Sequence, residues 1–241
     1  MTELTAPANL HAHPPATPRA FFATNGVLFV AIIGLVGTLA VGAKVADGWL
    51  LARWDEPVQR FVEGHRTEQL DVFFRLASRM GSTMVVLAVA ALLSAIAYSR
   101  CRAVAVALVA AALARPVLEF TLKHVVGRDR PHLDPLVTGD GYSFPSGHAL
   151  AAMAVWGMVP VVVGLFTTRR GLWWASVVVS AFMIVAIAAS RVYLGVHWLS
   201  DVVAGVLVGS LFLVGVEWFL QGAHRVAGCG RPCREPSHRT G

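Results

Sequence analysis

Long apolar blocks separated by short polar segments dominate this sequence. Several blocks run for about twenty residues or more without Asp, Glu, Lys, Arg or His, which is the length that an α-helix needs to cross a bilayer core. Two further apolar blocks are shorter and continue into charged residues. The pattern predicts an all-α, polytopic membrane protein with six transmembrane helices: Phe21–Ala43, Met80–Ser99, Ala103–Val125, Ala149–Thr168, Gly171–Ser190 and Trp198–Leu220.

The connection between the first two spans has a pattern of its own. Asp55 and Pro57 are typical of a helix start, and Val58, Phe61 and Val62 follow at i, i+3 and i+4. An apolar stripe on a short helix between two spans is typical of a helix that lies in the membrane interface. We therefore expect an interfacial helical segment between the first and second spans.

One membrane domain is expected to occupy residues 20–220. Residues 1–19 are rich in Ala, Pro, Thr and His, show no apolar period, and are expected to form a disordered tail. The apolar run after Arg19 is longer than the roughly 7–15 residues of a signal-peptide core, which favours an uncleaved anchor helix. A basic C-terminal tail, residues 221–241, is expected to follow the last span.

Arginines in the short connections predict the orientation in the membrane. Arg100 and Arg102 link the second and third spans, Arg169 and Arg170 link the fourth and fifth, and Arg19 falls on the same side. Cytoplasmic loops carry an excess of Lys and Arg. Both termini are therefore expected in the cytoplasm, and the alternate connections on the extracytoplasmic side.

Composition agrees with a membrane protein and narrows the choice of partner. Hydrophobic residues make up 56% of the 241 residues and charged residues only 14%, with a mean hydropathy of +0.64. The net charge of +6 is of the kind that nucleic-acid-binding proteins carry. Here, however, the arginines lie in loops and tails, where cations flank membrane helices. The expected partner is therefore the lipid bilayer, and no nucleic acid.

Three polar clusters interrupt the apolar pattern, and all three fall on the predicted outer side. The first cluster, Lys123–Pro131, ends the third span. The second, Pro145–His148, opens the fourth span, and the third, Ser190–Asp201, bridges the fifth and sixth spans. Chain segments that are distant in the sequence would thus bring their polar side chains to one end of the helical bundle.

The cations of these clusters indicate an anionic substrate. Lys123, Arg130 and Arg191 would lie together at a membrane rim, which is costly unless an anion compensates their charge. Phosphoryl groups are bound and transferred by cations of this kind, and arginines offer bidentate forks. The backbone N–H groups of Ser146 and Gly147 would add a helix N-terminus as an anion site.

Two histidines supply candidate catalytic groups. His197 and Asp201 are spaced at i, i+4, so one helix face brings the carboxylate beside the imidazole. A carboxylate on one ring nitrogen fixes the tautomer and orients the other nitrogen as a nucleophile. His148 could then protonate the leaving oxygen. Each residue alone has an ordinary alternative, such as a helix cap for Asp201, and only their joint occurrence points to phosphoryl transfer.

The three clusters together resemble the signature of the type 2 phosphatidic acid phosphatase family, KxxxxxxRP, PSGH and SRxxxxxHxxxD, with every defining position filled. The resemblance implies a membrane lipid phosphatase without a metal ion or other cofactor. It implies His197 as the nucleophile of a phosphohistidine intermediate, Asp201 as its partner and His148 as the acid. It also implies a set of substrate phosphate-binding residues: Lys123, Arg130, Ser146, Gly147 and Arg191.

The third span contains charges that the signature does not include. Arg115, Glu119 and Lys123 are spaced at i, i+4 and i+8 and so share one helix face. Arg115 is expected deep in the bilayer, where it needs a partner such as Glu119. The three residues could form a charge ladder that supports Lys123, or Arg115 and Glu119 could be a purely structural pair.

Other functions would use the same residues. A phosphotransferase would pass the phosphoryl group from His197 to an acceptor other than water, and the same site serves both reactions. A haloperoxidase holds vanadate in a version of this site on related folds, but six membrane spans disfavour it. A channel or scaffold could line an anion path with the cations, but the His197–Asp201 pair would then have no purpose.

The expected substrate is a lipid whose phosphate lies at the membrane surface. Phosphatidate-type lipids and polyprenyl diphosphates both meet this condition. An outward-facing site fits the recycling of a polyprenyl carrier, such as undecaprenyl diphosphate, at a bacterial plasma membrane.

Overall fold

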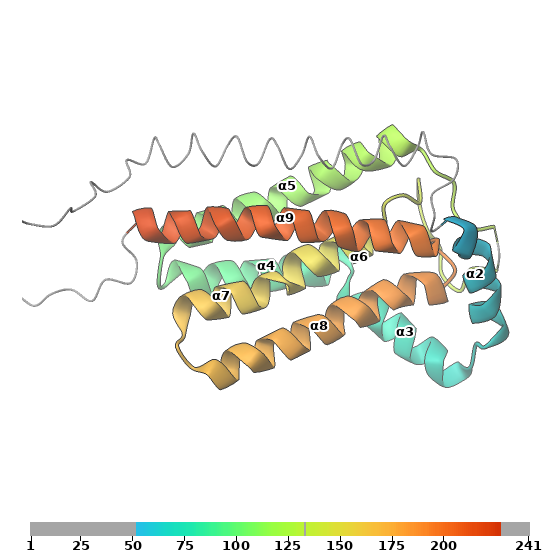
Figure 1. Ribbon diagram of the computed structural model, residues 1–241, viewed down its shortest axis with the longest axis horizontal. Helices are drawn as coiled ribbons and strands as arrows, with labels where there is room; N and C mark the ends of the chain where they lie inside the picture. Colours follow the sequence, from blue (N-terminus) through green and yellow to red (C-terminus); the bar gives the residue numbers. More distant parts are fainter. Residues whose placement is uncertain (1–51, 133, 228–241) are drawn as a thin grey trace, which may run out of the picture.

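The computed structural model describes residues 52–132 and 134–227 and is helical without strands over these ranges (Figure 1). The expected all-α class is confirmed for this part of the chain. The predicted first span, Phe21–Ala43, and the predicted tail, residues 1–19, lie outside the described residues. In chain order the elements are η1 (Ala52–Trp54), α2 (Asp55–Gly64), α3 (Glu68–Met80), α4 (Thr83–Tyr98), α5 (Arg102–Val126), α6 (Gly147–Ala151), the π-helical η2 (Ala152–Trp156), α7 (Met158–Phe166), α8 (Arg170–Tyr193) and α9 (Leu199–Val226).

Four segments of the described chain are long and apolar enough to cross a membrane: α5, the run from α6 to α7, α8 and α9. They coincide with the last four predicted spans, although α9 continues to Val226 instead of ending at Leu220. α3 and α4 meet at an angle of 49° and together would make a fifth, bent span. The full count of six, which requires Phe21–Ala43, remains a prediction.

The span from Gly147 to Phe166 is not a uniform α-helix, because η2 interrupts it with a π-helical turn. Pro160 follows four residues after Trp156, the last residue of η2. A proline has no N–H to give to the carbonyl of residue i−4, and its ring crowds that carbonyl. The widened turn before Pro160 is therefore a local consequence of the sequence, and α6 remains as a short helix that opens at the polar end.

A left-handed glycine ends α5 and directs the chain over the site. Gly127 has φ 62°, and its N–H donates to the carbonyl of Lys123 at 2.9 Å. Glycine adopts this conformation without steric cost, which is why it is common just past a helix end. The chain that follows leaves the helix axis and places Arg128 and Arg130 beside the start of α9.

Two glycines allow α9 to pack closely on the fourth span. The GxxxG spacing of Gly205 and Gly209 predicts close packing of helices within the bundle. A methyl group at Gly205 would lie 2.6 Å from the Ser146 carbonyl oxygen, and one at Gly209 would lie 2.7 Å from Met153 Cβ. The prediction is confirmed, and this close approach brings the start of α9 to the start of α6.

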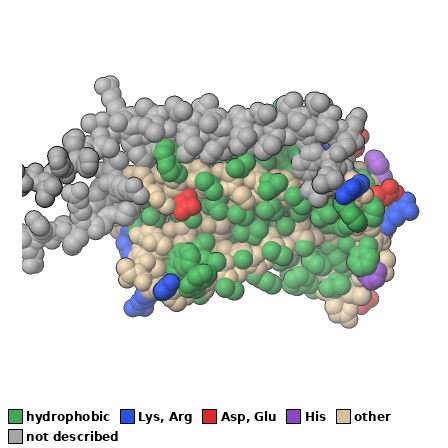
Figure 2. Space-filling model, viewed as in Figure 1, with side chains coloured by type: hydrophobic (Ala, Val, Ile, Leu, Met, Phe, Trp, Pro, Cys, Tyr) green, Lys and Arg blue, Asp and Glu red, His purple; other side chains and the backbone are tan. Residues whose placement is uncertain are grey.

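The surface is divided between an apolar middle and charged ends. Figure 2 shows hydrophobic side chains along the length of the bundle and charged side chains gathered mainly at its two ends. Large exposed apolar side chains lie on α4, α5, α8 and α9, as expected of helices that face lipid. At one end, α2 crosses the bundle (Figure 1).

α2 forms at the position expected from the sequence. Its Val58 and Val62 pack on a buried cluster that includes Val192 and Val202, whereas Phe61 is exposed. The apolar stripe therefore serves partly to fix α2 onto the bundle. A location of α2 in the membrane interface remains a prediction.

Candidate active site

A cavity of about 250 Å³ opens at the polar end of the bundle. It is lined by residues of all three polar clusters, which the chain brings together from α5, the loop after it, α6, α8 and the connection between α8 and α9. Most of the predicted site residues line it directly, while Ser146 and Asp201 lie fully buried behind its wall. The lining residues from the predicted set are Lys123, Arg130, Gly147, His148, Arg191 and His197.

His197 lies in the connection between α8 and α9 with its imidazole almost fully buried. Its Nδ1 is 3.7 Å from Oδ2 of Asp201, a distance that allows an ion pair but exceeds a hydrogen bond. Its Nε2 lies 3.3 Å from Nη1 of Arg130, at the cavity wall. The predicted His197–Asp201 pairing is therefore present, with Nε2 as the nitrogen that faces the cavity.

Asp201 holds the start of α9 as well as facing His197. Its Oδ2 accepts a hydrogen bond of 3.0 Å from the backbone N–H of Trp198, three residues earlier. This is one half of a capping box, in which a side chain at the third helical position satisfies the N-cap N–H. The carboxylate of Asp201 therefore both caps α9 and lies beside His197.

Ser146 is placed differently from what the sequence indicated. Its backbone N–H donates to the carbonyl oxygen of Asp201 at 3.0 Å and so does not point into the cavity. Its hydroxyl oxygen is buried and has no hydrogen-bond partner among the described residues. A contact between this hydroxyl and phosphate remains a prediction, whereas Gly147 lines the cavity itself.

Arg130 is held in place by neutral carbonyl groups. Its guanidinium donates to the carbonyl oxygens of Gly141, Val196 and Asp140 at 2.9, 2.7 and 2.6 Å. Burial lowers its pKa, and the more distant carboxylates of Asp201 and Asp140 only partly offset this. A guanidinium fixed by carbonyl dipoles keeps its charge available for an anion in the cavity.

Arg191 and His148 approach the cavity from α8 and α6. Arg191 is buried and donates from Nη1 to the hydroxyl of Ser78, on α3. His148 packs against the bend between α3 and α4, where a methyl group at Gly81 would lie 3.1 Å from its Cδ2. The bend therefore leaves room for the imidazole at the wall of the cavity.

The three charges spaced along α5 do contact one another. Glu119 accepts from Nη1 of Arg115 at 2.8 Å and lies 3.3 Å from Nζ of Lys123. Arg115 and Glu119 also line the cavity, so the ladder forms part of its floor. The Glu119 carboxylate rests against Gly147, where an added methyl group would collide with it.

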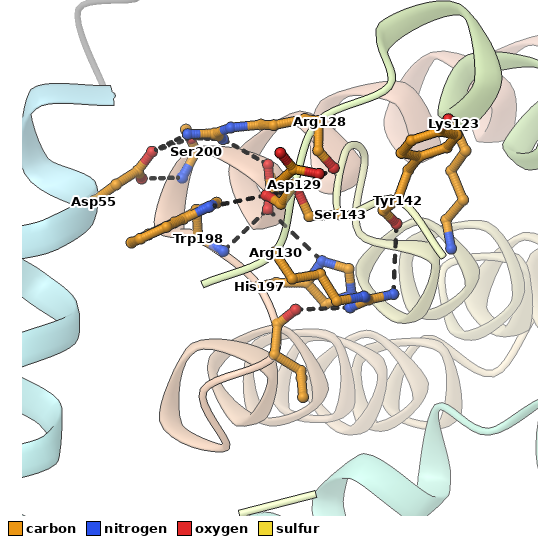
Figure 3. Close-up of polar contacts among 12 residues, drawn as sticks. Asp55, Lys123, Arg128, Asp129, Arg130, Tyr142, Ser143, His197, Trp198 and Ser200 are labelled. Atoms are coloured by element: carbon orange, nitrogen blue, oxygen red, sulfur yellow. Dashed lines mark hydrogen bonds and ion pairs between the residues drawn. The ribbon is translucent and has the colours of Figure 1, made fainter. Parts of the chain in front are cut away.

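A second charged network, absent from the sequence-based prediction, lies behind His197. Figure 3 shows Arg128 reaching both Asp55 and Ser200. Arg128 donates to Oδ1 of Asp201 at 2.6 Å and to Oδ2 of Asp55 at 2.7 Å. Arg128 stands two residues before Arg130 in the first cluster, and the sequence around Asp55 indicates only a helix start. Nothing in their spacing indicates that α2 folds back onto α9.

The electrostatic setting favours a neutral, nucleophilic His197. Burial lowers the pKa of its imidazole to about 4; Asp201 partly offsets this shift, while Arg191 and Arg130 reinforce it. At neutral pH the ring is therefore unprotonated on one nitrogen. If the proton lies on Nδ1 toward Asp201, the lone pair of Nε2 lies at the cavity wall beside Nη1 of Arg130, where a bound phosphoryl group would be within its reach.

Comparison with known proteins places the chain in a family. Residues 103–225 match the PAP2 superfamily. Undecaprenyl-diphosphatase of Sulfolobus acidocaldarius is 35% identical over 180 residues, which cover 71% of this chain and 81% of that protein. The chain belongs to the PAP2 superfamily. Phosphatidylglycerophosphatase B of Bacillus subtilis is 32% identical over 108 residues, which cover 43% of this chain and about half, 51%, of the relative.

Solved structures show the same fold. A transmembrane PAP2-type phosphatidylglycerolphosphate phosphatase from Bacillus subtilis superposes with a TM-score of 0.64 at 22% identity, covering 80% of this chain and 93% of that one. LpxE from Aquifex aeolicus gives a TM-score of 0.53 at 23% identity, covering 66% and 92%. The likeness shows that the described helices adopt this fold, and four of them are long and apolar enough to cross a membrane.

The contact between Gly147 and Glu119 generates a prediction about anion binding. Gly147→Ala should push the Glu119 carboxylate aside, disturb Lys123 and narrow the cavity. We expect affinity for inorganic phosphate, measured by calorimetry in detergent micelles, to fall at least about 10-fold, or ~1.4 kcal/mol. The matched control is Gly171→Ala, because an added methyl group there meets nothing within 4 Å. Unchanged phosphate affinity in Gly147→Ala would contradict this description of the cavity floor.

Proposed function

We propose that this protein is a metal-independent lipid phosphatase, which hydrolyses a lipid phosphate or diphosphate through a phosphohistidine on His197. One observation carries the proposal: a single cavity joins a buried His–Asp pair, a second histidine and cations from separate segments of the chain. The names of the relatives, a phosphatidylglycerophosphatase and an undecaprenyl-diphosphatase, point in the same direction.

The first chemical step transfers the phosphoryl group to the enzyme. Lys123, Arg130 and Arg191 hold the non-bridging oxygens and stabilise the charge that spreads over them in the transition state. Nε2 of His197 attacks phosphorus as the bond to the lipid oxygen breaks. His148 gives its proton to that leaving oxygen. Asp201 faces Nδ1 of His197 and offsets the positive charge that develops on the imidazole.

The second step releases the phosphate. His148, now neutral, accepts a proton from a water molecule, and the resulting hydroxide oxygen forms a bond to phosphorus. The phosphorus–nitrogen bond breaks, and His197 returns to its neutral form. Inorganic phosphate leaves the cavity, and His148 is again protonated for the next turnover. Side chains supply all the positive charge in this mechanism.

Substitutions in the two histidines and the aspartate test this mechanism. His197→Ala should lower kcat at least about 1,000-fold, and Asp201→Asn should leave a folded enzyme slowed at least about 100-fold, because it keeps the shape but not the charge. His148→Ala should slow hydrolysis of substrates with poor leaving groups more than of those with good ones. Steady-state phosphate release in micelles measures all three.

The exposed His124, on the outside of α5, provides the matched control, and His124→Ala should retain wild-type turnover. Vanadate should inhibit the wild-type enzyme, since it mimics five-coordinate phosphorus, and EDTA should not. Wild-type activity in His197→Ala, or strict dependence on an added divalent metal ion, would refute the proposed mechanism.

We propose a lipid substrate whose phosphate enters the cavity from the outer interface while its chain stays in the bilayer. The cavity opens where apolar helices end, and the exposed Phe61 on α2 lies at the same end. Binding energy from a remote chain can be used to position the reacting phosphate, so a substrate without that chain should lose catalytic efficiency. Within this class we propose polyprenyl diphosphates first, as the name of the undecaprenyl-diphosphatase relative suggests, and phosphatidate-type lipids next.

The lipid requirement can be measured directly. We expect kcat/KM for a polyprenyl diphosphate or a phosphatidate to exceed that for glycerol phosphate at least about 100-fold, or ~2.7 kcal/mol of transition-state binding. Both kinds of substrate are assayed in the same micelles. Equal efficiency on glycerol phosphate would refute the lipid class while leaving the phosphatase mechanism intact.

We propose an extracytoplasmic active site in a bacterial plasma membrane, with both termini in the cytoplasm. Arg100 donates to the carbonyl of Phe166 at 3.4 Å, so the two arginine-bearing connections lie together, at the end of the bundle away from the cavity. Positive charge of this kind marks the cytoplasmic side.

Cysteine labelling tests this orientation. A membrane-impermeant maleimide should label Thr138→Cys, at the cavity, in intact cells and should not label Thr168→Cys, in the connection between α7 and α8. Inverted vesicles should give the opposite pattern, with wild-type labelling subtracted as background. Labelling of Thr168→Cys alone in intact cells would reverse the proposed orientation.

A further inference from the structure

Asp55 is a buried carboxylate that serves a helix other than its own. It is the first residue of α2 and only 4% exposed, yet it makes no cap for α2. Instead its Oδ1 accepts the backbone N–H of Ser200 at 2.8 Å, and its Oδ2 accepts the Ser200 hydroxyl at 2.6 Å. Asp55 therefore caps the first turn of α9, where helix geometry leaves N–H groups unpaired and favours negative charge.

Arg128 connects this carboxylate to Asp201. One terminal nitrogen donates to Asp201 and to the hydroxyl of Ser200, and the other donates to Asp55, at distances of 2.6 to 2.7 Å. Burial alone would lower the pKa of the Arg128 guanidinium, but the carboxylates of Asp201 and Asp55 raise it above its usual value. Arg128 is thus a permanent cation held between two anions.

The two oxygens of Asp201 have separate tasks. Arg128 binds Oδ1, whereas Oδ2 accepts the backbone N–H of Trp198 and faces Nδ1 of His197. A charge-assisted bond on one side of a carboxylate fixes the direction of the other side. Arg128 therefore sets the angle at which Asp201 meets His197.

Asp55 determines how much charge Asp201 presents. Arg128 alone would cancel the charge of Asp201, whereas one guanidinium shared by two carboxylates leaves one net negative charge in the group. In a buried setting, such a charge acts strongly on a neighbouring imidazole. A negative charge beside His197 stabilises the cationic imidazole that forms when phosphorus is attacked.

We propose that Asp55 and Arg128 are positioning residues of the active site: Arg128 orients the carboxylate of Asp201 toward His197, and Asp55 prevents Arg128 from cancelling its charge. The proposal rests on the proposed role of His197 as the nucleophile. It adds α2, which lies outside the three polar clusters, to the machinery of the site.

The pH dependence of kcat/KM reports the charge beside His197. Only the neutral imidazole attacks phosphorus, so activity falls on the acid side as His197 becomes protonated. We call this fall of kcat/KM the acid limb of the profile. Loss of a nearby negative charge lowers the pKa of His197 and moves the acid limb to lower pH, whereas loss of a nearby positive charge moves it to higher pH. Besides Arg128 and Asp55, the charged or titratable groups around His197 are Asp201 from α9, Arg191 from α8, His148 from α6, Arg130 and Asp140 from the loop, and Arg115, Glu119 and Lys123 from α5.

Opposite shifts in two variants are the expected signature. Asp55→Asn should move the acid limb to lower pH and Arg128→Gln should move it to higher pH, each by about half a unit or more. Both should lower kcat about 10-fold and keep KM within about 3-fold, because neither residue touches the phosphate. Ionisation of the substrate contributes equally to every variant and cancels in the comparison.

Two exposed residues of α2 provide matched controls. Glu56 and Arg60 form an exposed ion pair on this helix, so Glu56→Gln and Arg60→Gln repeat the charge changes without contact with α9. Both should leave the acid limb in place. Arg128→Lys keeps the positive charge but loses the two terminal nitrogens with which a guanidinium binds both carboxylates. It should therefore lower kcat without moving the acid limb of the pH profile. This variant also tests the proposal if Asp55→Asn does not fold in detergent.

The outcomes separate the inference from the proposed function. Acid limbs that stay unchanged in Asp55→Asn and Arg128→Gln, or that move in the same direction, would overturn the inference, provided that wild-type activity depends on His197. If Asp55→Asn does not fold, an acid limb that moves by the same amount in Arg128→Gln and Arg128→Lys would overturn the inference. Absence of activity in the wild type, or its persistence in His197→Ala, would instead overturn the proposed function.

Discussion

The burial of the Asp201 carboxylate is the constraint on which the polar end of this bundle depends. A charge without access to water must be met by donors with good geometry. Here Arg128 and the N–H of Trp198 bind its two oxygens, and His197 faces one of them. The carbonyl of the same residue accepts the N–H of Ser146. One residue thereby holds the start of α9 and the start of α6 and places a negative charge beside the imidazole.

The cavity in front of Asp201 combines this anchored imidazole with cations that are held but not neutralised. Arg130 is bound by carbonyl groups, and Arg191 by a hydroxyl. Lys123 differs, because Glu119 lies beside it and also contacts Arg115. Net positive charge remains around the cavity, and such a site favours a phosphoryl anion over a neutral ligand.

The sequence predicted the parts of this site that depend on local periodicity. Helical spacing aligned Arg115, Glu119 and Lys123, and the apolar blocks located the last four spans. The expected proximity of His197 and Asp201 is present, but His197 precedes α9, so the two residues do not share a helix face. The sequence could not predict the contact of α2 with α9, because no periodicity links Asp55 to Ser200. For the same reason the use of the Ser146 N–H by Asp201 was missed: a helix start indicates an available N–H, but tertiary packing decides which acceptor receives it.

Chemical trapping of the intermediate tests the central claim most directly. The enzyme is mixed with substrate labelled with ³²P, quenched within milliseconds in base, and digested for peptide mapping. We expect label that is stable in base, labile in acid and located on His197, and no label in His197→Ala. Label on a different residue, or phosphate release in single turnover without any labelled His197, would contradict the account.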